Sequence, residues 1–256
     1  MIDRREVQEQ LDEQFINVDP LVPSYREIRE VEAERFVSEL HDRTALLCID
    51  MQYLDAARGH GVFKDSVEHG IPPEAQEYYF TTLEKLVLPN VRRLQDAFRG
   101  RGLEVIHTRI QSLTQDGRDR GAQHRRLGLH AAPGSKDAEF VAEVAPQGDE
   151  ITLSKTASGV FSSTTLELVL RNLGIEALVV CGVYTDECVS TTVRHASDLG
   201  FDTVLVEDAC TCVTQERHEF TVSTLRNRYV RVLTTEEVLA QLELQEKAVE
   251  QKSRGE

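Results

Sequence analysis

The sequence predicts a doubly wound α/β fold, in which a mainly parallel six-stranded sheet is covered by helices on both faces. Short apolar runs rich in β-branched residues, the pattern of buried strands, recur along the chain. Between them lie segments that carry apolar residues at helical spacing. Strands that alternate with helices in this way indicate a parallel sheet with helices on both faces.

The chain of 256 residues divides into three parts. Residues 1–42 are polar and charged, and Pro20 and Pro23 separate two helical segments there, so we expect an N-terminal helical arm. Residues 43–247 contain every predicted strand and no segment that resembles a linker, which indicates one main domain. Residues 248–256 form a charged tail.

The elements of the main domain follow from these patterns in order. The predicted strands are 44–50, 103–108, 150–154, 177–181, 201–206 and 229–233. The predicted helices are 81–100, 162–172, 188–199, 215–228 and 234–247, and Pro89 should bend the first of them or end its first part. Residues 51–79 and 110–148 are predicted as long surface segments, which are commonly functional.

Composition limits the partners of the protein. A net charge of −15 argues against nucleic acid and anionic membranes, because both require a basic face. No apolar run approaches the ~20 residues that span a bilayer. The N-terminus is charged from its third residue, and the odd count of five cysteines suits reduced thiols. We therefore expect a cytoplasmic protein whose partner is a small molecule.

The stretch 177–199 contains the first candidate for chemistry. Gly182 ends its apolar run, and Thr185 and Asp186 offer oxygens that can cap the helix that follows. Cys188 falls in the first turn of that helix, where the positive end of the helix dipole favours a thiolate. On this stretch alone, a nucleophilic cysteine and an ordinary buried cysteine both remain open.

Two further candidates lie at the same edge of the predicted sheet. Asp50 ends the first predicted strand, and Lys155 directly follows the third. The carboxyl ends of strands in a doubly wound sheet converge on one crevice, so Asp50, Lys155 and Cys188 can meet there. A carboxylate can take the thiol proton, and a lysine can hold that carboxylate and favour the thiolate. This set predicts nucleophilic attack on a carbonyl group.

Three motifs at these residues resemble the isochorismatase-like cysteine hydrolases, which include nicotinamidases, carbamoylsarcosine amidases, and biuret and ureidoacrylate hydrolases. The motifs are Ile49-Asp50-Met51-Gln52, Lys155 with Gly159, Phe161, Thr164 and Leu166, and Gly182-Val183-Tyr184-Thr185-Asp186-Glu187-Cys188-Val189. The third is the most specific, and the resemblance covers roughly residues 43–240. It implies the isochorismatase-like hydrolase fold, with residues 43–247 as the catalytic domain.

The resemblance also implies roles for individual residues. It assigns Asp50, Lys155 and Cys188 as a catalytic triad, and it implies a cis peptide bond between Val183 and Tyr184. The backbone N–H groups of Tyr184 and Cys188 are then expected to form the oxyanion hole. Further predicted substrate-binding residues are Gln52, Tyr53, Arg109, Phe161 and Thr185.

The sequence departs from the family after Asp-Met-Gln. Many members continue Asn-Asp-Phe, whereas Tyr53, Leu54 and Asp55 stand here. Nicotinamidases bind a metal through an Asp-x-His pair shortly after the catalytic aspartate. The corresponding stretch of this chain has no Asp-x-His pair, and its two histidines, His60 and His69, are nine residues apart. We therefore expect no metal and no cofactor.

These observations predict a cysteine-dependent hydrolase. It would cleave the C–N bond of a small amide, carbamoyl or ureido compound through an acyl-enzyme and release ammonia. Two alternatives remain: a vinyl-ether hydrolase of the isochorismatase type, whose members need no cysteine, and a non-catalytic binding or oligomerisation module. We also expect a homo-oligomer, a dimer or tetramer, with the N-terminal arm at a subunit contact.

Overall fold

The architecture is described from a computed structural model, which defines residue 40 and residues 42–65 and 70–254. The predicted N-terminal arm, residues 1–42, lies outside the described residues except for Leu40 and Asp42, so its helices stay a prediction. The predicted charged tail from residue 248 is helical as far as Arg254, because the last helix, α11 (Thr235–Arg254), extends into it.

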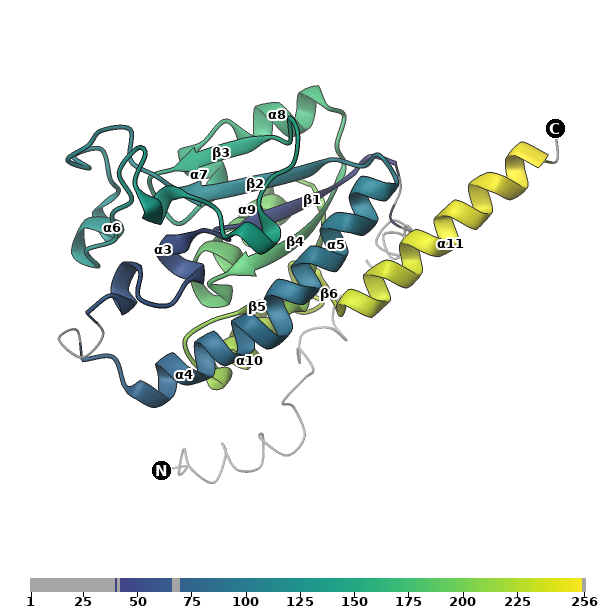
Figure 1. Cartoon of the computed structure of the whole chain (residues 1–256). Coiled ribbons are helices and arrows are strands. Elements are labelled where there is room, and N and C mark those ends of the chain that lie inside the picture. The colour runs from purple at the N-terminus through teal and green to yellow at the C-terminus, as the bar shows by residue number, and fades with distance from the viewer. Residues whose placement is uncertain (1–39, 41, 66–69, 255–256) are drawn as a thin grey trace, which may run out of the picture.

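A single sheet of six parallel strands forms the centre of the described chain (Figure 1), which confirms the predicted doubly wound class. Its spatial order is β3-β2-β1-β4-β5-β6. The strands are β1 (Thr44–Ile49), β2 (Val105–Ile110), β3 (Thr152–Lys155), β4 (Ala177–Val183), β5 (Asp202–Thr211) and β6 (Arg231–Leu233). Every residue of β1 and β4 is buried, as expected for the central strands of a parallel sheet.

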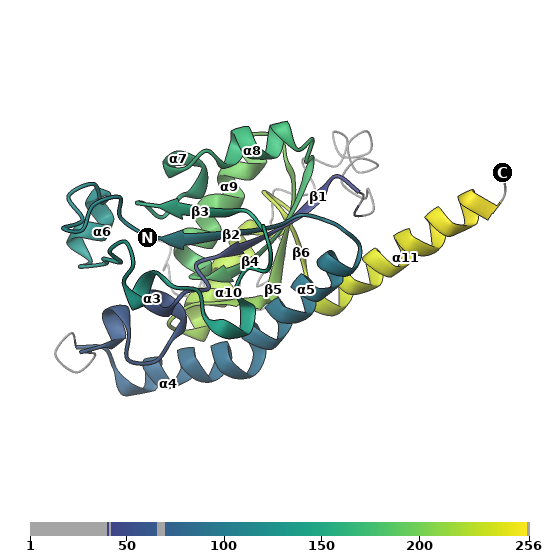
Figure 2. The ribbon, with the colours of Figure 1, turned by 45° about the horizontal axis from the view of Figure 1, so that its top comes forward.

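Helices cover both faces of this sheet (Figures 1 and 2). One face carries the long run α4 (Pro73–Thr82), η3 (Leu83–Val87) and α5 (Leu88–Gly100), against which α11 packs. The other face carries α7 (Val160–Ser163), α8 (Leu166–Asn172), α9 (Ser190–Asp198) and α10 (Gln215–Leu225). Among the described helices, none has the length and apolarity needed to cross a membrane.

Short helical segments occupy the two long stretches that were predicted as surface excursions. The first contains α3 (Tyr53–Ala56) and η2 (Gly61–Phe63), and the second contains α6 (Ala122–Arg126), η4 (Lys136–Ala138) and η5 (Ala142–Val144). In Figures 1 and 2, α3 and α6 lie beyond the carboxyl ends of the strands. Both therefore border the edge where parallel sheets place their ligands.

Tertiary packing moves several predicted boundaries. The helix predicted from residue 81 begins at Pro73 and is not ended by Pro89, because Pro89 lies in the first turn of α5 after the π-helical segment η3. The fourth strand continues past Cys181 to Val183. The fifth strand continues to Thr211 because its end pairs with this extension after a bulge.

Candidate active site

The strand order brings the three predicted catalytic residues to one place. Asp50 directly follows β1, Lys155 ends β3, and Cys188 lies in the π-helical segment η6 (Thr185–Val189) that follows β4. The neighbours β1 and β4 mark the point where the chain begins to add strands on the other side of the sheet. Ligands of open α/β sheets bind at such a switch point.

Lys155 contacts both other members of this candidate triad. Its ammonium nitrogen Nζ lies 2.8 Å from Oδ2 of Asp50 and donates to Sγ of Cys188 at 3.2 Å. It also donates to the carbonyl oxygen of Ala157 at 3.2 Å. The ammonium therefore makes one ion pair and two hydrogen bonds. The exposed fractions are 0% for Lys155, 1% for Asp50 and 3% for Cys188, so the charges interact away from bulk water.

The backbone of Asp50 is held in a conformation that most residues avoid. Its φ angle is 54°, in the left-handed region that is sparsely populated by residues other than glycine. Its N–H donates to the carbonyl oxygen of Thr108 at 3.0 Å, and the Thr108 hydroxyl donates to Asp50 Oδ1 at 3.4 Å. Thr108 is a site residue that the sequence analysis missed, although it ends the second predicted strand at the same edge.

Gly182 allows β4 to approach β1 next to the site. Its φ angle is 120°, and a Cβ atom at this position would lie 2.1 Å from the carbonyl oxygen of Ile49. No side chain fits at that distance, so only glycine can occupy the position. The close approach fixes the end of β4 beside Asp50, from which the segment containing Cys188 begins.

Helix α10 holds the segment that contains Cys188. The Thr185 hydroxyl lies 2.9 Å from Nδ1 of His218, and Arg217 Nε donates to Asp186 Oδ2 at 2.6 Å. The peptide bond between Val183 and Tyr184 is cis, which confirms the expectation drawn from the family resemblance. Thr185, predicted to bind substrate, is fully buried and anchors η6 to α10.

The charge states differ from the expectation drawn from the helix dipole. Burial raises the pKa of the Cys188 thiol well above its ordinary value, and the positive charge of Lys155 offsets only part of that rise. The surroundings of Cys188 therefore favour the thiol over the thiolate. Cys188 precedes α9 in the π-helical segment η6, so the dipole at the start of a regular helix does not outweigh the loss of solvation.

The two partners of Cys188 are tuned in a related way. Burial raises the pKa of Asp50, while Lys155 lowers it by charge and hydrogen bonding. Burial alone would lower the pKa of Lys155, but Asp50 and Cys188 together raise it above its ordinary value. Lys155 thus stays protonated, and Asp50 is a stronger base than a solvated carboxylate, which suits it to accept the thiol proton.

Two of the predicted substrate-binding residues make local contacts near the triad. Gln52 is fully buried, and its amide nitrogen donates to the carbonyl oxygens of Ile110 at 2.9 Å and Asp137 at 2.8 Å. Tyr53 is the first residue of α3, and the ammonium nitrogen of Lys136 lies 3.9 Å from the centroid of its ring. Gln52 therefore fixes the loop after β1, and the predicted roles of both residues toward a substrate stay predictions.

Two other predicted substrate-binding residues are directed elsewhere. Arg109 alternates with Thr108 along β2 and so points to the opposite face of the sheet, where it donates to Ser154 Oγ and to the carbonyl oxygen of Ala138. The Phe161 ring packs at centroid distances of 5.4 Å from His195 and 5.9 Å from Phe201. None of these contacts is with a triad residue, and the predicted roles of Arg109 and Phe161 toward a substrate stay predictions.

Two buried polar side chains near the triad were not predicted as site residues. Asp55 in α3 and His124 in α6 are each 1% exposed. Neither carboxyl oxygen of Asp55 and neither ring nitrogen of His124 has a hydrogen-bond partner in the described part of the chain. The sequence offers one signal for Asp55, because many family members have a different residue at this position. It offers no signal for His124.

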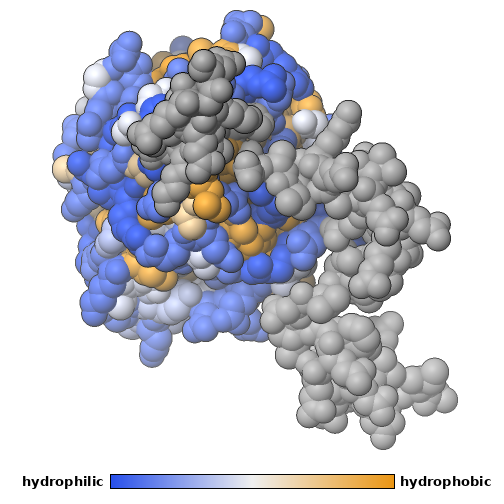
Figure 3. All heavy atoms as spheres, turned by 90° about the vertical axis from the view of Figure 1, so that its right-hand side faces the viewer, coloured by the Kyte–Doolittle hydropathy of each residue, from blue (hydrophilic) through white to orange (hydrophobic). Residues whose placement is uncertain are grey.

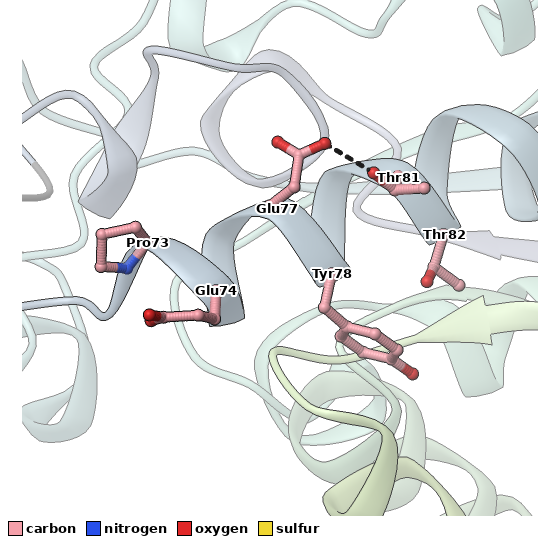
Figure 4. Close-up of a pocket in the computed structure, with 6 residues that line it drawn as sticks. All are labelled: Pro73, Glu74, Glu77, Tyr78, Thr81 and Thr82. Atoms are coloured by element: carbon pink, nitrogen blue, oxygen red, sulfur yellow. Dashed lines mark hydrogen bonds between the residues drawn. The ribbon is translucent and has the colours of Figure 1, made fainter.

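An open hollow on α4 lies apart from these residues (Figure 4). Its volume is about 520 Å³, and its lining is Pro73, Glu74, Glu77, Tyr78, Thr81 and Thr82. Figure 4 shows Thr81 donating to Glu77, at 2.8 Å, so these polar groups are paired with each other. The hollow contains no triad residue, and we assign it no chemistry.

The described residues contain no group of three or more His, Cys, Asp and Glu side chains placed to hold a metal ion. That the protein needs no metal and no cofactor therefore stays a prediction.

Fold and site together define an α/β protein with a buried Asp–Lys–Cys cluster at the carboxyl edge of a parallel sheet. The family model for the isochorismatase domain matches residues 44–237. The chain belongs to the isochorismatase family, and it is a hydrolase of that family, as the three motifs indicated.

Known proteins similar to this chain agree with that assignment. The uncharacterized isochorismatase family protein YwoC of Bacillus subtilis is 34% identical over 161 residues, which cover 61% of this chain and 83% of YwoC. Maleamate amidohydrolase of Pseudomonas putida is 29% identical over 143 residues, or 55% of this chain and 67% of that enzyme. The crystal structure of an isochorismatase family protein from Desulfovibrio vulgaris has a TM-score of 0.64 at 26% identity, and the match covers 77% of this chain and 98% of that one.

Proposed function

We propose that this protein hydrolyses the C–N bond of a small amide, carbamoyl or ureido compound through Cys188 and releases ammonia. One observation carries the proposal: a single buried ammonium, that of Lys155, lies 2.8 Å from the Asp50 carboxylate and 3.2 Å from the Cys188 sulfur. This arrangement provides a nucleophile, a base and a cation that stabilises both anions.

The proposed reaction begins with transfer of the thiol proton of Cys188 to Asp50. The sulfur attacks the substrate carbonyl carbon and forms a tetrahedral oxyanion. The backbone N–H groups of Tyr184 and Cys188 are expected to stabilise this oxyanion. Asp50 then gives its proton to the nitrogen, the C–N bond breaks, and ammonia leaves a thioester on Cys188. Water attacks the thioester, Asp50 takes one water proton, and that proton returns to the sulfur as the acid product leaves.

The relatives support an amide-type substrate, since maleamate amidohydrolase is among the proteins similar to this chain. A cysteine at 3.2 Å from a lysine has no role in the vinyl-ether alternative, which needs no cysteine. A non-catalytic module would not require a charged pair with 0% and 1% exposure, whose burial costs several kcal/mol per ion before pairing.

Ammonia release from a panel of amides tests this function. We expect the wild type to turn over at least one of biuret, N-carbamoylglycine, maleamate and nicotinamide, and Cys188→Ser to lose that activity. Iodoacetamide followed by mass spectrometry should modify Cys188 faster than Cys181 or Cys210, because only Cys188 of these three lies beside Asp50 and Lys155, which can take its proton and stabilise the thiolate. Equal labelling of all the cysteines, together with no ammonia from any compound, would favour the binding module.

We further propose that the protein is a cytoplasmic homo-oligomer, a dimer or tetramer. Helix α11 extends away from the sheet and its covering helices in both ribbon views (Figures 1 and 2). Figure 3 shows that, where coloured atoms are visible on this side of the molecule, hydrophobic residues are interspersed among hydrophilic ones. A projecting helix offers a surface for a second copy.

Light scattering at micromolar concentration tests this assembly. It should give a mass of two or four times 28.9 kDa, and a mass equal to one chain would contradict the proposal.

A further inference from the structure

The inference concerns Asp55 and His124, which the proposed mechanism does not use. Buried polar side chains normally have a hydrogen-bond partner, and an unsatisfied one costs about 1–3 kcal/mol. Among the described residues, both carboxyl oxygens of Asp55 and both ring nitrogens of His124 lack a hydrogen-bond partner. Two such residues close to one candidate active site call for an explanation that involves the site.

Asp55 reaches the triad from α3. Its turn is held in place because the Tyr79 hydroxyl donates to the Asp55 carbonyl oxygen at 2.7 Å. The charged groups that act on its carboxyl are Asp50, Lys155 and Glu187, and the Tyr184 hydroxyl lies beside it without a hydrogen bond of normal geometry. The ammonium of Lys155 is already engaged by Asp50, and none of the other charged groups that act on Asp55 in the described part of the chain is a cation.

His124 approaches the triad from α6, which is docked onto the residues that follow Lys155. The Gly121 N–H donates to the carbonyl oxygen of Thr156 at 2.8 Å, and the Ser158 hydroxyl donates to the Gln123 side chain. Gln123 in turn donates to Glu187 at 3.4 Å, next to Cys188 in the chain. The charged groups that act on His124 are Lys155 and Arg120, both cations.

Both side chains are tuned to be neutral. Burial raises the pKa of Asp55 well above its ordinary value, and Asp50 and Glu187 raise it further. Burial lowers the pKa of His124 to about 4, and the charges of Lys155 and Arg120 act in the same direction. A protonated carboxyl and a neutral imidazole each offer one donor and one acceptor.

We propose that Asp55 and His124 determine the substrate specificity of this hydrolase by hydrogen bonding to an uncharged substrate. That substrate carries N–H and C=O groups on both sides of the scissile bond, as a ureide does. The inference rests on the proposed function and names the substrate class within it. Among the described residues, a carboxylate of the substrate would find no free cation beside Asp55 and would lose its hydration there. Arg120, the second cation that acts on His124, already donates to the carbonyl oxygens of Gly117 and Leu129. Biuret should therefore be preferred to N-carbamoylglycine and maleamate, which carry a carboxylate.

The test compares paired substitutions on the panel compound that the wild type hydrolyses best. Asp55→Leu and His124→Leu leave substrate groups unpaired and should each reduce kcat/KM by ~10- to 100-fold, mainly through KM. Asp55→Asn and His124→Gln keep a donor and an acceptor and should restore kcat/KM to within a few-fold of wild type.

Thermal unfolding separates this role from a structural one. Since neither side chain has a hydrogen bond in the free protein, the leucine variants should keep or raise the unfolding midpoint. His107→Gln is the matched control, because His107 is a buried histidine that does have a partner, Glu150 at 2.9 Å. It should lower the midpoint and leave the order of substrates unchanged.

Three results would overturn the inference. The first is a leucine variant that loses stability and activity together without a change in KM. The second is a wild type that prefers maleamate or N-carbamoylglycine to biuret, with ammonia release still dependent on Cys188, which contradicts the substrate class and leaves the proposed function intact. The third is a wild type that releases ammonia from no compound of the panel, which overturns the proposed function and the inference with it.

Discussion

Two charged clusters lie against this sheet, one partly buried and one fully buried, and their chemistry differs. In the first, Glu150 accepts from Arg99 Nε at 2.6 Å, Arg99 Nη2 at 3.0 Å and the Gln147 N–H at 2.9 Å, and its Oε2 lies 2.9 Å from His107 Nε2. In the second, Lys155 faces Asp50 and Cys188, and the nearby Asp55 has no hydrogen bond of normal geometry at either carboxyl oxygen.

The pKa values of the acids follow this difference. Burial would raise the pKa of Glu150, but its hydrogen bonds and the charge of Arg99 lower it to about 2. Burial raises the pKa of Asp50 and of Asp55, because fewer groups compensate. A carboxylate that accepts several hydrogen bonds, as Glu150 does, is held in its charged form, whereas a carboxyl group with few partners leaves a proton free to move. We infer that the first cluster serves stability and the second serves chemistry.

The largest expected effect is the loss of turnover when the second cluster is broken. Cys188→Ser and Asp50→Asn should each reduce ammonia release by ~1000-fold or more, because groups that act as one unit fail together. Circular dichroism should show an intact fold in both variants. A variant that keeps more than about a tenth of wild-type activity would contradict the assignment of its residue.

The next effect is on stability. Lys155→Met leaves the Asp50 carboxylate buried without a cation, and breaking one side of a buried pair costs about 3–5 kcal/mol. Denaturant unfolding measures this loss. The double variant Asp50→Asn/Lys155→Met removes both charges and should recover most of it, whereas equal destabilisation in the single and double variants would show that the pair does not act as a unit.

A smaller effect is expected in the first cluster, and it depends on pH. The pKa of Glu150 is lowered in the folded state, from an ordinary 4.5 to about 2, so its contribution is present above pH ~4.5 and is lost as the pH falls to ~2. The full contribution is about 3 kcal/mol. Glu150→Gln should remove this acid dependence of the unfolding midpoint and leave kcat/KM within a few-fold. A large loss of kcat/KM would break the distinction between the clusters.

The smallest expected effect is a shift in the pH dependence of kcat/KM when Thr108 is replaced. Its hydroxyl donates to Asp50 and lowers the pKa of that carboxyl, so Thr108→Val should raise it. In the proposed mechanism, activity requires the Asp50 carboxylate and is lost as the pH falls through its pKa. The acid limb of kcat/KM should therefore move to higher pH in this variant. At neutral pH the loss should be only a few-fold. A limb that moves to lower pH, or stays in place, would exclude Asp50 as the group that titrates.

The sequence by itself determined the fold and the meeting of the triad. Continuous apolar runs such as 44–49 and 177–181 have no stable place except a strand buried on both faces, and such strands lie parallel in an α/β sheet. Once the strands are parallel, residues that follow them share one edge. Asp50, Lys155 and Cys188 could therefore be brought together without coordinates.

Only the tertiary structure decided where other side chains point and which protons they hold. Arg109 also lies near the carboxyl end of its strand, but the alternation of side chains sends it to the opposite face of the sheet from Thr108. The protonation of Cys188 depends on how completely its surroundings exclude water. Asp55 and His124 lie in segments without a periodic pattern, and whether such a side chain is buried and unpaired depends on every segment packed around it. A sequence pattern reports a local repeat, whereas solvation is a property of the assembled neighbourhood.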